Sequence, residues 1–293
     1  MNSDNSDPLY KQFCENHSFD LLNILCQKFA VQPSLKKALC HYTSLEALVN
    51  GILGADRAEG NEVILRATSL AYMNDPNEVI TGAKVASFVL QNVIDNNTIP
   101  EDSIKEAQSK LYTTCFSLQR DSLPMWSTYG NNGKGLVLLF DAKSIWKAYG
   151  THLFKCFYDN GKDICRVLKQ WVDKLEIGNL AQESPYEKTL LNGLNPSQVI
   201  TFLLLFIAKN HSYKYEDEVR AVLFDDSPVK YRVSGNLIIP YKEICLPKES
   251  LHEIIVGPCN DPSRTKESIT GYLNSIGMNH VYVSNSLVPY RLK

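Results

Sequence analysis

The segment Tyr215–Phe224 has the clearest strand pattern in the chain, and it places charged side chains on a β-sheet. Alternate side chains of a strand point to the same face, so Glu216, Glu218 and Arg220 lie together on it. The apolar residues of this strand point to the opposite face, toward a core: Val219, Ala221 and Leu223. Like charges side by side destabilise a sheet unless something neutralises them. The charged row is therefore either a solvated Arg–Glu ladder or part of a binding site.

Strand-like and helix-like patterns alternate along the rest of the chain, without internal repeats or linkers. The other predicted strands are a short one that ends at Tyr42, then 63–70, 111–118, 136–140, 152–158, 238–239, 251–256 and 280–283. The predicted helices are 43–54, 77–92, 164–175, 186–191, 199–210 and 261–274. We expect an α+β fold in a single domain, 1–293, with a helical N-terminal segment at 9–39 and a helical insertion at 141–210.

Composition excludes several classes of protein. Hydrophobic residues make up 44% of the 293 residues and charged residues 21%, which is typical of a globular protein and not of a disordered one. The formal net charge of -2 gives no support to a protein that wraps duplex nucleic acid. None of the 8 cysteines forms a C-x-x-C pair or stands beside a histidine at zinc-finger spacing, so we expect free buried thiols and no metal site.

The sequence also favours an intracellular protein. The N-terminus lacks a basic segment followed by an apolar run, so we expect no signal peptide. The most apolar segment, Val199–Ala208, is much shorter than the roughly 20 residues that span a bilayer. We expect a cytoplasmic location without membrane contact.

A first candidate site is the triplet His41-Tyr42-Thr43, at the end of a predicted strand. Thr43 and Glu46 have the spacing of a capping box, which predicts that a helix begins at Thr43. A helix N-terminus beside an imidazole can bind a phosphate or a ribose hydroxyl. Taken alone, the pattern is more often a structural histidine near a helix start.

Two further segments combine turn and aromatic residues. Asn74-Asp75-Pro76 is a turn that either caps the next helix or contributes to a site. Trp126 and Tyr129 lie three residues apart, on one face of a short helix. These two rings pack in the core or form a stacking wall for a nicotinamide or adenine ring.

The order of these landmarks is more specific than any one of them: His-Tyr-Thr, Asn-Asp-Pro-x-Glu, Met-Trp-x-x-Tyr-Gly, then Glu-x-Glu-x-Arg. In this order, over roughly Leu39 to Arg291, the chain resembles a large, uncharacterised bacterial domain family. That family in turn resembles the toxin branch of the ADP-ribosyltransferase superfamily. The resemblance implies a split, mostly antiparallel β-structure with flanking helices and NAD bound in its cleft.

The resemblance also implies roles for individual residues. Glu218 would be the catalytic carboxylate, and Glu216 would position or deprotonate the acceptor. The cofactor-binding residues would be His41 on the ribose, with Tyr42 and Thr43 beside it, Tyr129 and Tyr72 stacked on nicotinamide, and Asn74 and Arg220. The segment Ala67-Thr68-Ser69 departs from the Ser-Thr-Ser strand usual in that superfamily.

We therefore expect an NAD-dependent ADP-ribosyltransferase that modifies a protein or a nucleic acid, in the setting of a bacterial toxin or phage-defence effector with an antitoxin or regulatory partner. NAD is its substrate. Loss of nicotinamide leaves an oxocarbenium-like centre, which a preorganised carboxylate stabilises without a metal.

Two alternatives remain open. In a non-catalytic binding module, His41 and Glu218 lie far apart, or Arg220 pairs with Glu218. In a metal-dependent nuclease, Asp75 and Glu78 lie within coordination reach of Glu218.

Overall fold

The computed structural model describes residues 31, 36–54, 62–75, 77–93, 104–105, 110–149, 153–159, 161–166, 196–223, 227–258 and 261–290. Most of the predicted N-terminal helical segment, 9–39, lies outside these ranges. So does the part of the predicted insertion between 167 and 195. Among the described residues, no helix has the length and apolar character needed to cross a membrane.

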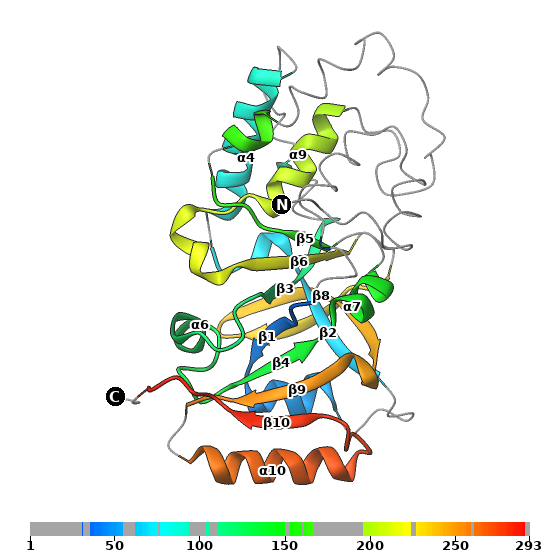
Figure 1. Ribbon diagram of the computed structural model, residues 1–293. Coiled ribbons are helices and arrows are strands. Elements are labelled where there is room, and N and C mark those ends of the chain that lie inside the picture. The colour runs from blue at the N-terminus through cyan, green and yellow to red at the C-terminus, as the bar shows by residue number, and fades with distance from the viewer. Residues whose placement is uncertain are drawn as a thin grey trace.

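A mixed, mostly antiparallel sheet of 10 strands forms the centre of the protein, and helices flank it (Figure 1). The strands are β1 (Leu39–Thr43), β2 (Glu62–Ser69), β3 (Tyr112–Ser117), β4 (Leu136–Phe140), β5 (Leu153–Lys155), β6 (Glu218–Leu223), β7 (Lys230–Ser234), β8 (Leu237–Pro247), β9 (Leu251–Val256) and β10 (Tyr282–Asn285). Only the β9–β10 pair is parallel among the strand pairs of the described residues. The predicted α+β class is confirmed.

The flanking elements are short except for three helices. The α-helices include α3 (Leu45–Ala47), α4 (Glu78–Val93), α6 (Leu123–Thr128), α7 (Ala142–Tyr149), α9 (Pro196–Ile207) and α10 (Pro262–Ser275), and residues 162–166 are also helical. The remaining turns are η1 (Leu48–Ile52), η2 (Leu70–Tyr72), η4 (His211–Glu216) and η5 (Lys248–Ser250). In Figure 1, α10 lies along β9 and β10, while α4 and α9 lie side by side at the opposite end of the molecule.

The sheet divides at β3, and we call this point the fork. Along one edge, β3 pairs with β6 from Tyr112 to Ser117. Its other edge is shared, because Ser117 pairs with β1 at one end while Thr113 and Tyr112 pair with β2 at the other. One arm then continues through β1, β4, β9 and β10, and the other through β2, β8 and β7. Two groups of strands therefore continue from one common strand.

Buried apolar side chains fix both arms. The larger core includes the inward face of β4, with Leu136, Leu138 and Phe140, and the helices α4, α9 and α10. A smaller core lies between the other face of β1 and β4 and helix α6, around the fully buried Trp126. Trp126 is therefore a core residue, and its indole N–H donates to Asp121 at 2.6 Å.

The predicted strand at 215–224 is wrong at its start. β6 begins only at Glu218, and Glu216 ends the 3₁₀ turn η4. Asp217, between them, has a φ of 43°, which is the left-handed region and interrupts the strand. Glu216 and Glu218 are therefore not neighbours on one strand face, although both remain close to the fork.

The predicted capping box is wrong by one residue. Thr43 is the last residue of β1, and Ser44 caps the helix by accepting a hydrogen bond from the backbone of Ala47 at 3.1 Å. The α-helix itself is only one short turn, after which the chain widens into the π-helical turn η1. No long helix begins beside His41.

Candidate functional site

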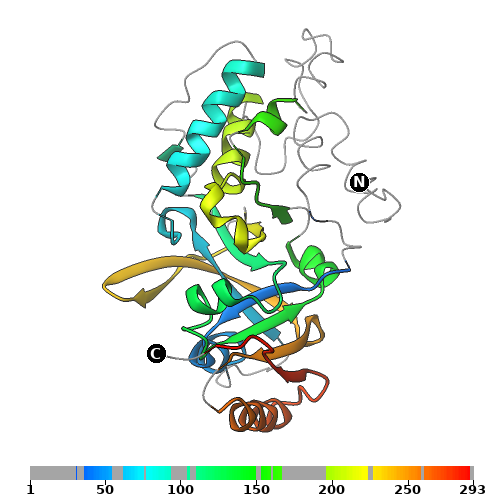
Figure 2. The same ribbon diagram turned by 60° about the vertical axis from the view of Figure 1, so that its left-hand side comes forward.

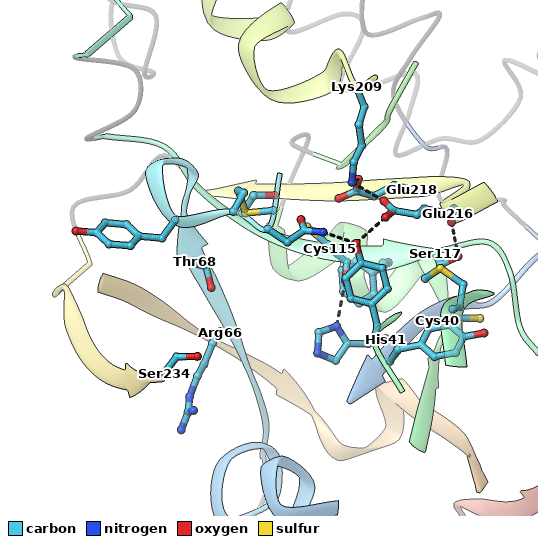
Figure 3. A pocket seen from close by; sticks show the side chains of 18 of the residues that line it. Cys40, His41, Arg66, Thr68, Cys115, Ser117, Lys209, Glu216, Glu218 and Ser234 are labelled. Atoms are coloured by element: carbon cyan, nitrogen blue, oxygen red, sulfur yellow. Dashed lines mark hydrogen bonds and ion pairs between the residues drawn. The ribbon is translucent and has the colours of Figure 1, made fainter. Parts of the chain in front are cut away.

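A cavity of about 370 Å³ opens between the two arms at the fork. Its walls come from β1, β2, β3, β7 and β8, from η2 and the turn after it, from α6, and from the segment 209–218. All but two of the residues predicted for the site line it: His41, Tyr42, Tyr72, Asn74, Tyr129, Glu216 and Glu218. Segments distant in sequence therefore meet at one cavity, part of which Figure 3 shows.

Glu216 lies in the cavity wall with part of its bonding capacity unused. Its side chain accepts a hydrogen bond from the Tyr129 hydroxyl at 2.6 Å, and its other oxygen pairs with the Lys209 ammonium. Asn74 donates to the same Tyr129 hydroxyl. Burial, together with the bond to Glu216, raises the pKa of Tyr129 far above its usual value, so the phenol stays a neutral donor. A carboxylate has about four lone-pair sites, and the described residues donate to two of those on Glu216.

The carboxylate of Glu218 is fully occupied. Arg220 donates to both of its oxygens, at 2.9 and 3.2 Å, and Lys209 donates to one of them at 2.6 Å. The Cys115 thiol is also hydrogen-bonded to it. Burial alone would raise the pKa of Glu218, but the charges of Arg220 and Lys209 outweigh burial and lower it well below its usual value. Glu218 is therefore an ionised residue that has no lone pair left for a ligand.

Arg220 lies behind the cavity wall and does not line it. Its side chain is fully buried, pairs with the carboxylates of Glu78 and Glu218, and donates to the Phe206 carbonyl at 2.6 Å. Burial raises the pKa of Glu78, an effect that the charge of Arg220 opposes. Arg220 therefore joins α4, α9 and β6 rather than contacting a ligand in the cavity.

Lys209 and Glu78 complete this network. The sequence interpretation considered Glu78 only as a ligand in the nuclease alternative, and it missed Lys209. Lys209 is 2% exposed and bridges Glu216 and Glu218. Lys209 lies near the end of the predicted helix 199–210, whose other residues are so apolar that the whole helix was interpreted as part of the core. A single lysine at the end of such a segment was the available signal, because a lysine is almost never fully buried unless it is paired.

His41 occupies the fork itself. Its Nδ1 lies 3.0 Å from the Cys115 carbonyl oxygen of β3. Because a carbonyl can only accept, Nδ1 carries the proton and donates. Burial lowers the pKa of His41, an effect that this hydrogen bond opposes in part. The neutral ring therefore keeps an unprotonated Nε2 as a hydrogen-bond acceptor on a residue that lines the cavity.

Tyr42 and Thr43 differ in their relation to the cavity. Tyr42 lines it, and its hydroxyl donates to the Gln119 carbonyl at 2.9 Å and accepts from the Ser122 backbone at 3.2 Å. This hydroxyl therefore anchors the loop that leads into α6. Thr43 is not among the residues lining the cavity, because it pairs with Leu136 of β4 at the end of β1 remote from the β3 pairing.

Two arginines form a basic end of the cavity that the sequence interpretation did not identify. Arg66 of β2 and Arg232 of β7 both line it, together with the hydroxyl side chains of Thr68 and Ser234. Figure 3 shows Arg66 and Ser234 on the side opposite to Lys209, Glu216 and Glu218. The cavity is therefore polarised, with carboxylates at one end and guanidinium groups at the other.

The residues of the nuclease alternative do not assemble. Asp75 is buried, and its carboxylate accepts from the Asn77 backbone at 2.9 Å, so it forms the turn that precedes α4. Within the ranges that the structure describes, no group of three or more His, Cys, Asp or Glu residues is placed to hold a metal ion. Asp75, Glu78 and Glu218 therefore do not form the predicted metal cluster.

One family model matches part of the chain. The model of a family described as a protein of unknown function, DUF2971, matches residues 125–221. The match runs from α6 to β6 and includes Tyr129, Lys209, Glu216 and Glu218. The predicted resemblance to an uncharacterised domain family is confirmed, over a shorter segment than expected. No curated protein and no solved structure gives a significant match.

Proposed function

We propose that the chain binds NAD in the fork cavity and transfers its ADP-ribosyl group to a macromolecular acceptor, a protein or a nucleic acid. The observation that carries this proposal is that Glu216, with unused acceptor sites, lines the same cavity as His41, whose Nε2 is unprotonated. Both groups accept hydrogen bonds, and the hydroxyls of a ribose donate them. A ribose between these residues satisfies all of these groups.

Glu216 is the residue proposed to contact the reacting sugar. A carboxylate that holds a ribose hydroxyl stabilises the positive charge that develops at C1′ as nicotinamide leaves. Lys209 donates to it from within the buried network and holds it in place. Glu216 therefore provides negative charge in a fixed position before the reaction begins.

Glu218 then has a different role from the one the resemblance implied. Because Arg220, Lys209 and Cys115 occupy its oxygens, Glu218 acts as a positioning residue. It holds Lys209, and Lys209 holds Glu216. The two glutamates thus share one lysine but differ in what they offer to a ligand.

The aromatic residues support the nicotinamide end of the proposed complex. Tyr129 lines the cavity, and its hydroxyl is fixed by Glu216 and Asn74. Tyr72 also lines the cavity, is 42% exposed and can adjust to a ring. A nicotinamide ring held against these side chains lies beside Glu216, the carboxylate proposed to stabilise the charge that develops as nicotinamide leaves.

The proposed reaction breaks the bond between C1′ of the ribose and the nicotinamide nitrogen. The bonding electron pair leaves with nicotinamide, which loses its positive charge. An acceptor nucleophile forms the new bond to C1′ and releases a proton. If water takes the place of the acceptor, the products are nicotinamide and ADP-ribose, so exclusion of water determines the outcome.

The test measures nicotinamide release and transfer of an adenylate-labelled ADP-ribosyl group, with and without whole-cell lysate. We expect the purified wild type to be active and Glu216→Gln to be slower by about 10²-fold or more, as when one transition-state partner is removed. Glu249→Gln, which changes an exposed acid in η5, is the control and keeps full activity. Absence of NAD consumption by the wild type even with lysate, or an undiminished rate in Glu216→Gln, contradicts the proposal.

A non-catalytic binding module is the second candidate, and one observation favours it. Arg220 pairs with Glu218 and Lys209 bridges both glutamates, as in a structural network. In that case the wild type binds NAD or ADP-ribose without consuming NAD. Calorimetry in parallel with the turnover assay separates the two candidates. An antitoxin or regulatory partner belongs to the first candidate only.

A further inference from the structure

We infer that Arg66 and Arg232 form a phosphate-binding subsite at the basic end of the fork cavity, and that it takes the diphosphate of a dinucleotide ligand. The identity of that ligand rests on the proposed function. The subsite itself rests on the placement of the two guanidinium groups.

Strand register places the four polar residues of this end on one face. In β8, Glu243 pairs with Arg66, Tyr241 with Thr68, Ile239 with Arg232 and Leu237 with Ser234. These partners are alternate residues of β8, so their side chains share a face. Arg66, Thr68, Arg232 and Ser234 therefore all point to the same side of the β2–β8–β7 arm, and all four line the cavity.

The Arg66 guanidinium is held in place by its surroundings. It lies over the ring of Tyr241, at 5.0 Å from the ring centre. On another side it lies against the backbone at Gly51, where a Cβ atom would be 3.2 Å from the guanidinium. The cross-strand carboxylate, Glu243, accepts from Lys230 at 2.6 Å. Arg66 is therefore a preorganised donor group in the cavity wall.

The two arginines lie close enough to influence each other. Burial and the charge of Arg66 both lower the pKa of Arg232. Among the residues that the structure describes, none forms a hydrogen bond or an ion pair with either guanidinium. Two like charges at one end of a cavity destabilise the empty protein, and an anion between them removes that cost. Guanidinium groups match phosphate in geometry, because each can donate two parallel hydrogen bonds.

The charge distribution also fixes the direction of the ligand. NAD carries a positive nicotinamide ring at one end of its diphosphate bridge. With the diphosphate at Arg66 and Arg232, the nicotinamide ribose extends toward His41 and the carboxylate end, which lies on the opposite side of the cavity (Figure 3). Thr68 and Ser234 add hydroxyl donors beside the phosphates.

Figure 2 shows that the β7–β8 hairpin, which carries Arg232, projects from the body of the molecule. Arg232 is therefore a better position for a test variant than Arg66, whose side chain packs on Tyr241 and Gly51. Arg264→Gln is the matched control, because it changes an exposed arginine of α10 that does not line the cavity. Lys230 is not suitable, since its loss would free Glu243 opposite Arg66.

The experiment measures dissociation constants by calorimetry for ADP-ribose, pyrophosphate and nicotinamide riboside, which lacks the diphosphate. We expect Arg232→Gln to bind ADP-ribose and pyrophosphate about tenfold or more weakly, as on loss of a hydrogen bond to a charged group. Arg264→Gln is expected to bind as the wild type does. Nicotinamide riboside is expected to bind equally to all three proteins.

Each other outcome overturns the inference. If Arg232→Gln binds ADP-ribose as tightly as the wild type does, or if Arg264→Gln weakens binding equally, there is no specific phosphate contact. If nicotinamide riboside is weakened as much as ADP-ribose, Arg232 acts on the shape of the cavity and not on phosphate. Arg66→Gln, with its fold checked by circular dichroism, is expected to repeat the effect of Arg232→Gln.

The inference and the proposed function can fail separately. NAD turnover with unchanged phosphate affinity in Arg232→Gln would leave the transferase in place and remove the subsite. Binding of pyrophosphate and ADP-ribose through Arg232 without any NAD turnover would leave the subsite in place and remove the transferase.

Discussion

At the scale of single residues, Glu216 and Glu218 show how local contacts decide what a carboxylate can do. The left-handed backbone at Asp217 turns the chain between them, so that Glu216 ends η4 and Glu218 begins β6. Glu218 receives Arg220, Lys209 and Cys115, while Glu216 receives only Tyr129 and Lys209 among the described residues. Glu218 therefore has no acceptor site left, while Glu216 can still accept hydrogen bonds from a ligand.

The stability of the buried network provides a prediction about Glu218. Its folded-state pKa lies below the ordinary value of 4.5, so between those two values the unfolded chain binds more protons than the folded chain. The stabilisation is therefore present above 4.5 and is lost as the pH falls through the lower, folded-state pKa. We expect Glu218→Gln to lose about 3 kcal/mol at neutral pH, because it leaves buried cationic partners without their charge. It should also respond less steeply to acid than the wild type.

Urea unfolding followed by circular dichroism, at neutral pH and at several values below 4.5, measures both effects. Glu249→Gln, at an exposed position, serves as the comparison. Equal acid sensitivity in Glu218→Gln and in the wild type would mean that Glu218 is not the ionised centre of the network.

Sequence identified the residues at the cavity more readily than it identified their partners. His41, Tyr129 and the two glutamates belong to recognisable motifs, and all four line the cavity. Lys209 belongs to none of these motifs, and Glu78 ends the Asn-Asp-Pro-x-Glu motif without any local sign of its partner. Their pairing with Glu216 and Arg220 depends on how α9 and α4 pack, and no local pattern specifies that packing.

At the scale of elements, the close contact of α4 and α9 depends on a glycine. A Cβ atom at Gly82 of α4 would lie 2.7 Å from the Leu205 Cα and 2.8 Å from the Leu204 carbonyl oxygen. These are backbone atoms, so they cannot move aside as a flexible side chain can. Because α4 carries Glu78 and α9 precedes Lys209, this contact also sets the geometry of the buried network.

We predict that Gly82→Ala lowers the free energy of unfolding by about 1–3 kcal/mol, since the added methyl group forces the helices apart. Gly271→Ala is the matched control within α10, where the added Cβ would have no neighbour within 4 Å. Removing this exposed helical glycine should raise stability by about 0.5–1 kcal/mol. Chemical denaturation of both variants checks the pair. Equal shifts in the two variants would contradict the account of the α4–α9 contact.

Element boundaries were predicted best where the local pattern was continuous. β4 and β9 have the predicted bounds, and α4 differs by one residue at each end. β7 was missed because its segment, Lys230–Ser234, has few apolar residues and its side chains are largely exposed. The two-residue loop Gly235-Asn236, with a φ of 59° at Gly235, was the available hairpin signal. The missed strand carries Arg232, so half of the basic end was missed with it.

At the scale of the whole molecule, the fork determines where a ligand can bind. β3 pairs with β6 along one edge and is divided between β1 and β2 along the other. His41 satisfies the Cys115 carbonyl at the division, which leaves its second ring nitrogen for the cavity. Strand patterns predict that these segments are extended but do not specify which edges pair. For that reason the class of fold followed from the sequence and the position of the cavity did not.

A crystal structure of the Glu216→Gln variant with NAD tests the central claim most directly, because this variant is expected to bind the dinucleotide without consuming it. The account predicts NAD in the fork cavity, with the nicotinamide ribose between His41 and position 216 and the diphosphate at Arg66 and Arg232. NAD bound outside the fork, or bound in it with the diphosphate at the carboxylate end, would contradict the account.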